Sequence, residues 1–149
     1  MTDKHPGALY WDASAVLSLL FKDFHSDSAA TWAHGGAVHL ISTLACAETS
    51  AVIARLQRDQ AVTDVLAQSA RNALASGPWR RTTVQPDWEK IHSLATSWPL
   101  RGADLWHLAC AKSLQQHLPE LHLLTFDNRL HEAALGEGLI HAGPMRGKA

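Results

Sequence analysis

Short apolar segments alternate with longer helix-like segments along this chain, and that alternation limits the folds open to it. ALYW (8–11), VHLIS (38–42) and LHLLTF (121–126) have the length and apolar content of buried strands. Strands separated by helices predict an α/β architecture with a mostly parallel sheet.

Turn and helix-start residues divide the rest of the sequence. Further strands are expected at RTTV (81–84) and GLIH (138–141), which makes a sheet of about five strands. We see no repeat and no long linker, so residues 1–149 are expected to form a single domain. The helices are expected at about 13–21, 26–34, 43–57 with a continuation past a break near Asp59 to Leu74, from Pro86 to about Trp98, from Gly102 to about His117, and after Asn128.

Cysteine and tryptophan usage indicates a reducing compartment and a well-filled core. Cys46 and Cys110 form no CxxC pair and are expected to be small buried hydrophobes, which fits the cytoplasm. No signal peptide and no membrane-spanning apolar run is expected. Of the six tryptophans, we expect Trp11, Trp88 and Trp106 in the core, and Trp32, Trp79 and Trp98 at an interface.

Two acids each close a predicted strand. Asp12 follows ALYW, and Asp127 follows the strand that begins at Leu121. In parallel α/β sheets, ligands bind at the carboxyl ends of the strands. Asp12 and Asp127 are therefore expected to point into one crevice although they lie far apart in the sequence.

Glu48 interrupts the apolar face of its predicted helix. Leu44, Glu48 and Val52 form one row at i, i+4 and i+8. An unpaired carboxylate there would cost several kcal/mol, so it needs a cation or strong donors. One alternative is an internal ion pair with Arg101 or Arg129.

Asp104 lies in the first turn of a helix that is apolar on nearly every side. Helix capping alone would explain an acid there, but a helix so apolar is expected to be buried with its acid end facing the interior. Carboxylates that converge repel one another by roughly 4 kcal/mol per close pair, which a bound cation relieves. Oxygen ligands select Mg²⁺ or Mn²⁺ over zinc. The pair His107 and Cys110 lacks the two further ligands that a zinc site needs.

Other phosphate chemistries fit the sequence less well. It has no Gly-rich phosphate loop and no GxSxG motif. A haloacid-dehalogenase-type phosphatase needs DxD where this chain has Asp12-Ala13-Ser14, and a receiver domain needs a late Lys after a strand. The net charge of −1 means that any polyanion must be held locally. The candidate side chains for this are Arg55, Arg58, Arg80, Arg81, Arg101 and Arg129.

Four stretches of the chain resemble the PIN-domain nucleases, and among them the VapC-type toxins of toxin–antitoxin pairs. They are LYWDASAVLSLLF, STLACAETSAVIARL, LRGADLWHLACA and LLTFDNRLHEAALGEGL, in the family's order and at its usual separations. The resemblance implies a three-layer α/β/α fold with a central parallel sheet. It also implies an acidic pocket for Mg²⁺ or Mn²⁺, endonuclease cleavage of RNA, a homodimer and an inhibiting antitoxin.

The resemblance also assigns the site residues. Asp12, Glu48, Asp104 and Asp127 match the catalytic and metal-binding acids of the family, and Ser14 and Thr125 match its small hydroxyl positions. Many relatives carry a further acid where this chain has Asn128 and Arg129, which bears on whether a second ion binds.

The expected activity is metal-assisted hydrolysis of RNA phosphodiester bonds, with Arg101 or Arg129 on a phosphate. A housekeeping RNA-processing or DNA-repair nuclease is one alternative. A catalytically silent binding module, whose acids hold a partner's arginine, is another.

Overall fold

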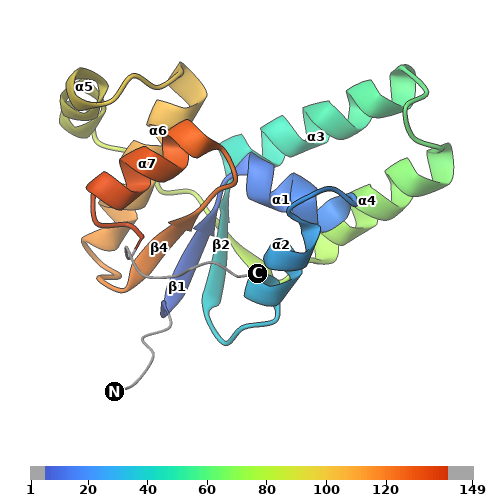
Figure 1. Cartoon of the computed structure of the whole chain (residues 1–149), viewed down its shortest axis with the longest axis horizontal. Coiled ribbons are helices and arrows are strands. Elements are labelled where there is room, and N and C mark those ends of the chain that lie inside the picture. Colours follow the sequence, from blue (N-terminus) through green and yellow to red (C-terminus); the bar gives the residue numbers. More distant parts are fainter. Residues whose placement is uncertain (1–5, 141–149) are drawn as a thin grey trace.

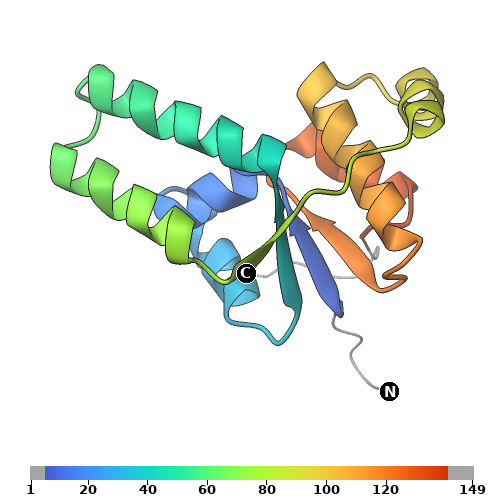
Figure 2. The same ribbon diagram turned by 180° about the vertical axis from the view of Figure 1, so that it is seen from behind.

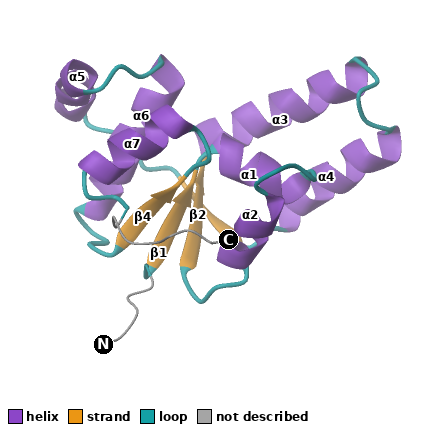
Figure 3. Ribbon diagram, in the orientation of Figure 1, coloured by secondary structure: helices purple, strands orange, loops and turns teal. Residues whose placement is uncertain are grey.

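A four-stranded parallel sheet forms the centre of the molecule (Figure 1, Figure 3). The computed structural model describes residues 6–140. The strands lie in the order β3-β2-β1-β4, and each pairs in parallel with its neighbours. Their bounds are β1 Ala8–Trp11, β2 Val38–Ser42, β3 Trp79–Thr82 and β4 Leu121–Leu124.

Helices cover both faces of this sheet, as Figure 1 and the reverse view in Figure 2 show. Leu9 and Trp11 pack in a core cluster with residues of α1, α2 and α3, whereas Ala8 and Tyr10 pack in a second cluster with α5, α6 and α7. This division follows from the two-residue repeat of a strand, which sends alternate side chains to opposite faces. The helices are α1 Ala13–Leu20, α2 Ser26–Ala33, α3 Thr43–Arg58, α4 Asp64–Ser76, α5 Trp88–Ser97, α6 Gly102–Gln115 and α7 Asn128–Gly136.

The sheet has one strand fewer than the sequence predicted. Residues 138–140 form a turn and bend instead of a strand, and His141 lies outside the described residues. Gly138, at φ +77°, ends α7 in a Schellman motif: Leu139 N donates to Ala134 O at 2.8 Å and Gly138 N to Leu135 O at 3.2 Å. The backbone groups needed for a fifth strand are largely used by this cap, and only Leu139 O bonds to β4, accepting from Leu123 N at 3.0 Å.

The third strand also begins earlier than predicted, at Trp79. The Trp79 side chain is buried and meets Trp11 edge-to-face at a centroid distance of 5.5 Å. It therefore belongs to the core and not to an interface, and this packing places residues 79–82 beside β2. The core prediction for Trp88 is wrong, because Trp88 is 81% exposed, whereas the core prediction for Trp11 is confirmed.

Three of the helices follow a strand, and each is capped by a polar side chain at or shortly after the carboxyl end of that strand. The caps are Asp12 for α1, Ser42 for α3 and Asp127 for α7, which accept from the backbone N–H of Ala15, Ala45 and Leu130 respectively. Their positive helix ends therefore face the carboxyl edge of the sheet, where negative charge is stabilised. None of the helices between residues 6 and 140 has the length and apolar character needed to cross a bilayer.

The segment that leads into α6 is fastened to the end of α7. Trp98 donates its indole N–H to Glu137 at 2.8 Å, and a Cβ added to Gly136 would lie 2.4 Å from the Trp98 ring. Gly136→Ala is therefore expected to lower the free energy of unfolding by about 1–3 kcal/mol, as overpacking does. Urea unfolding measures this.

Gly36→Ala is the matched control, because no atom lies within 4 Å of its added Cβ. It is expected to be neutral or slightly stabilising. Equal stability of the Gly136→Ala variant and the unaltered chain would show that the Trp98 contact does not hold this junction.

Candidate active site

Asp12 is a buried carboxylate whose two oxygens are both hydrogen-bonded. Oδ1 accepts from Ser14 Oγ at 2.7 Å and from Ala15 N at 2.9 Å, and Oδ2 accepts from Thr125 Oγ1 at 2.6 Å. Burial raises the pKa of the Asp12 carboxyl, and these three donors act in the opposite direction by favouring its charged form. The side chain is 3% exposed and is held in a single direction by donors from two parts of the chain.

The hydroxyls of Ser14 and Thr125 also join the first and last strands at this edge. The two oxygens lie 3.2 Å apart. Ser14 Oγ accepts from Phe126 N at 3.0 Å, and Thr125 Oγ1 accepts from Asp127 N at 3.1 Å. The corner between β1 and α1 is thereby bonded to the corner between β4 and α7, which brings Asp127 to the same edge as Asp12.

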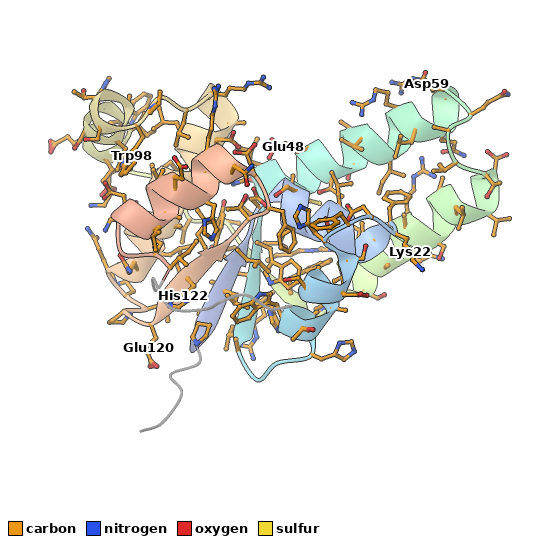
Figure 4. The ribbon with its side chains drawn as sticks, viewed as in Figure 1. Lys22, Glu48, Asp59, Trp98, Glu120 and His122 are labelled. Carbon is orange, nitrogen blue, oxygen red and sulfur yellow. The ribbon has the colours of Figure 1, made fainter. Side chains whose placement is uncertain are left out.

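Asp104 and Glu48 face Asp127 from two other helices. The pKa of Asp104 is raised, first by burial and then by the negative charge of Asp127; His107 and Arg101 lower it, and Glu48 raises it. Because charge–charge effects decline with distance, these groups lie within electrostatic reach of Asp104. Figure 4 shows Glu48 at the start of α3, above the end of the sheet. Asp12 and Asp127 therefore lie at one edge of the sheet, and Asp104 lies within electrostatic reach of Asp127 and Glu48. That the four acids form one site stays a prediction.

The partner of Glu48 is a histidine and not an arginine. His107 Nε2 lies 2.6 Å from Glu48 Oε1, and neither Arg101 nor Arg129 forms an ion pair within the described part of the chain. The arginine alternative is therefore wrong. Both arginines are exposed, whereas His107, three residues after Asp104, is 1% exposed and points inward from α6.

The His107 ring also bonds to the core of the sheet. Its Nδ1 lies 2.6 Å from the Tyr10 hydroxyl, and that hydroxyl donates to Ser42 Oγ at 3.0 Å. Because Tyr10 gives its only proton to Ser42, the contact with His107 needs a proton on Nδ1.

A family model described as PIN domain matches residues 9–135 of the sequence. The chain belongs to the PIN domain family. Ribonuclease VapC45 and Ribonuclease VapC49, from two strains of Mycobacterium tuberculosis (CDC 1551 / Oshkosh and ATCC 25618 / H37Rv), are each 34% identical to this PIN domain over 136 residues. The match covers 87% of this chain and 91% of each relative.

Solved structures share the fold of this PIN domain at much lower identity. PAE2754 from Pyrobaculum aerophilum has a TM-score of 0.61 at 19% identity, with 87% of this chain and 86% of that chain covered. VapC20 from Mycobacterium tuberculosis, described as a sarcin-ricin loop cleaving toxin, has 0.60 at 16%, covering 91% and 99%. VapBC2 from Rickettsia felis, bound to a DNA fragment from its promoter, has 0.54 at 13%, covering 80% and 99%.

The acids of this PIN domain suit a hard divalent cation in chemistry, but their side chains are not arranged as a closed metal cage. Between residues 6 and 140, no group of three or more His, Cys, Asp or Glu side chains has the arrangement of a formed metal site. Asp12 is bonded to donors and Glu48 to His107. Mg²⁺ needs only one or two carboxylates together with water, so Asp104, which is half-buried and near the charge of Asp127, fits the role of its first ligand.

The hydrogen-bond network of Glu48, His107 and Tyr10 has only a weak signal in the sequence. His107 lies one turn after Asp104, so the two side chains share a face of the helix. Because the rest of the helix is apolar, the polar group of His107 can find a partner only near that face. Tyr10 carries no such signal, because a tyrosine in a buried strand looks like any other core residue.

Loss of the His107 ring is expected to destabilise the fold. His107→Leu leaves Tyr10 and Glu48 without their shared partner in a buried place, which costs about 1–3 kcal/mol of unfolding free energy. His131→Leu is the matched control, because His131 is exposed on α7 and its loss is expected to change stability by less than about 0.5 kcal/mol. Urea unfolding of both variants gives the comparison, and equal effects would contradict a role for the network.

Removal of the Asp104 charge is expected to stabilise the metal-free protein. Asp104→Asn removes a half-buried carboxylate and relieves its repulsion from Asp127, which at a solvent-screened site is worth about 0.5–1 kcal/mol. Because folding raises this pKa, the native carboxyl disfavours the folded state only as the pH rises through the raised value. The difference between Asp104→Asn and the unaltered chain should therefore close below the ordinary value of 3.8.

The measurement is urea unfolding in EDTA at neutral and acidic pH, then with added Mn²⁺. Mn²⁺ is expected to stabilise the unaltered chain more than the Asp104→Asn variant, since binding to the folded state alone adds stability. A variant that is less stable in EDTA, or equally stabilised by Mn²⁺, would exclude Asp104 as a crowded ligand.

Proposed function

We propose that this PIN domain is a Mg²⁺- or Mn²⁺-dependent endoribonuclease that hydrolyses RNA phosphodiester bonds. The observation that carries this proposal is the hydrogen-bonded edge of the sheet, where Thr125 bonds both the buried Asp12 carboxylate and the backbone N–H of Asp127. Asp104 lies near enough for the charge of Asp127 to raise its pKa. Acids crowded at the carboxyl edge of a parallel sheet are poorly suited to bind RNA alone, but they suit RNA bridged by a divalent cation.

The acids divide into two roles in this proposal. Asp104 and Asp127 line the accessible side, where Asp104 is half-buried and Asp127 is exposed, and they would hold the cation. Asp12 would complete the set from below, fixed by Ser14 and Thr125, and Glu48 would join it by exchanging its contact with His107. A bound cation would supply a water of lowered pKa and polarise a phosphoryl oxygen of the substrate.

The side chains of this PIN domain would orient the substrate around that edge. Arg101 precedes α6 and lowers the pKa of Asp104, which places its charge near the acids. Arg129 lies in the first turn of α7, two residues after Asp127. Guanidinium groups suit phosphate oxygens, so either arginine would contact the phosphate beside the cleaved bond. With water as the nucleophile, no covalent intermediate on the chain is expected.

We further propose that the chain acts in the cytoplasm as the toxin of a type II toxin–antitoxin pair, as a homodimer inhibited by a cognate antitoxin. Support comes from the two relatives that carry the name Ribonuclease VapC and from the likeness in fold to VapBC2. The large apolar side chains that remain exposed on the arm of α3 and α4, Val65 and Leu66, give such partners a surface to cover.

The activity is tested by incubating the chain with labelled single-stranded and hairpin RNA, and with DNA of the same sequences, in Mg²⁺, Mn²⁺ or EDTA. Internal cleavage of RNA is expected only with a divalent cation. Asp12→Asn and Asp104→Asn are each expected to lower the rate by about 100-fold or more while the fold is kept. Asp59→Asn is the control, because Asp59 lies at the far end of α3 (Figure 4), and it is expected to cleave normally.

The same set of proteins separates the competing functions. Cleavage that persists in EDTA would exclude metal dependence, and a preference for DNA would favour a repair nuclease. Tight Mn²⁺ binding without cleavage of any RNA would favour a silent binding module. Growth arrest on expression of the unaltered chain, but not of Asp104→Asn, is expected for a toxin and not for a housekeeping enzyme.

A further inference from the structure

Three aromatic rings, called the aromatic stack below, contact one another in series beside the acidic site, one pair parallel and the other edge-to-face. His25 lies parallel to Phe126, with ring centroids 4.5 Å apart and an interplanar angle of 2°. Phe24 meets His25 edge-to-face at 5.0 Å. The stack therefore runs from Phe126, which is partly buried, through His25 to Phe24, which is 93% exposed.

The inner end of this stack belongs to the machinery that holds the acids. Phe126 lies between Thr125 and Asp127, and its backbone N–H donates to Ser14 Oγ at 3.0 Å. In Figure 1 the segment that joins α1 to α2 runs back along α1 toward the edge of the sheet where α1 begins. The exposed ring is thus tied, through two ring contacts, to the strand end that carries Asp127.

Hydrogen bonds hold the segment that presents Phe24. The carboxylate of Asp23 accepts from Ser18 Oγ at 2.8 Å and from His25 N at 2.8 Å. Ser26 Oγ accepts from Asp23 N at 2.7 Å and donates to Phe21 O at 2.9 Å. The backbone on both sides of Phe24 is therefore fixed, and the exposure of this ring is not the result of a loose loop.

The surroundings of Phe24 disfavour an apolar protein segment as its ligand. The neighbouring residues Lys22, Asp23 and Asp27 are all exposed, so the ring does not belong to a wider apolar patch of the kind that binds helices or strands. Nucleobases stack on single aromatic rings whatever their sequence, and unpaired RNA bases are commonly held in this way. The ammonium group of Lys22 would offer a contact to the phosphate of the same nucleotide.

We propose that Phe24, supported by His25 and Phe126, is a stacking site for an unpaired nucleobase of the substrate strand, beside the nucleotide that is cleaved. This inference rests on the proposed ribonuclease function and adds a feature of its substrate: at least one base next to the cleaved bond is unpaired. The arginines would hold phosphates, and this stack would hold a base.

The test is binding of a 12-nucleotide single-stranded RNA that contains 2-aminopurine, measured by fluorescence with the cleavage-deficient Asp104→Asn chain. Phe24→Ala in that background is expected to weaken binding about 10-fold and to abolish quenching of the stacked 2-aminopurine. Phe24→Trp should retain both, because it keeps a π face. Trp88→Ala is the matched control, since Trp88 is also an exposed aromatic side chain (81%) but lies on α5, and it should bind as the parent does.

A kinetic measurement with the active chain separates stacking from a purely structural role. Phe24→Ala is expected to raise KM by about 10-fold with little change in kcat and no change in melting temperature, and Phe24→Trp is expected to restore KM. Equal RNA binding by the parent and Phe24→Ala, or no measurable RNA binding by the parent, overturns the stacking site. Unchanged RNA binding together with loss of a co-purifying protein partner also overturns it, in favour of a protein contact.

These outcomes are distinguishable from failure of the proposed activity. If the unaltered chain cleaves RNA and Phe24→Ala has the same KM, the stacking site fails and the nuclease stands. If the chain cleaves no RNA but Phe24→Ala still weakens binding, the nuclease fails and the base-binding site stands.

Discussion

The hydrogen-bonded carboxylate of Asp12 is the constraint on which the rest of this edge depends. A buried charge is costly unless donors satisfy it, and here they come from both ends of the chain: Ser14 and Ala15 after β1, and Thr125 after β4. The same two hydroxyls accept from the backbone at Phe126 and Asp127. The hydrogen bonds that stabilise Asp12 therefore also fix the position of Asp127. The register between β1 and β4 in turn sets how the two corners of the site meet.

Several features of the protein itself stabilise the negative charge of the site. The N-termini of α1, α3 and α7 face it, and Glu48 is hydrogen-bonded to His107, which in turn contacts Tyr10 in the sheet. Burial and the charge of Asp127 raise the pKa of Asp104, and His107 and Arg101 act in the opposite direction. Asp12 and Glu48 thus have hydrogen-bond partners within the protein, whereas the repulsion between Asp104 and Asp127 is left in place. A bound cation would remove that repulsion, and its removal would contribute to the binding energy of the cation.

The sequence was informative where one residue decides the local structure, and it failed where packing decides. The strand end before Asp12 and the helix starts after Asp12 and Asp127 followed from apolar runs and their polar terminators. The strand predicted over 121–126 is shorter and ends at Leu124. The fifth strand was wrong because Gly138 ends α7 in a cap that takes up the backbone groups, a choice made by one φ angle. Trp88 was expected in the core and is exposed, whereas Trp79 was expected at an interface and is buried. Both belong to short segments whose burial depends on residues distant in the sequence. The partner of Glu48 could not be predicted from the sequence for the same reason. Arg101, Arg129 and His107 are all distant from Glu48 along the chain, and only the position of α6 in the fold brings His107 against it.

The low net charge of the chain makes the aromatic stack important for the RNA binding proposed above. At a net charge of −1 the chain has no general attraction for a polyanion, and its most acidic region is the one that RNA would have to approach. Affinity must then come from contacts that do not depend on overall charge: a bridging cation, individual guanidinium groups and stacking on a ring. Stacking alone among these distinguishes an unpaired base from a paired one, because a base inside a duplex has both faces covered. A nuclease built in this way would select its substrate by local RNA structure near the cleaved bond more than by the charge of the whole molecule, and Phe24 stands where that selection would be made.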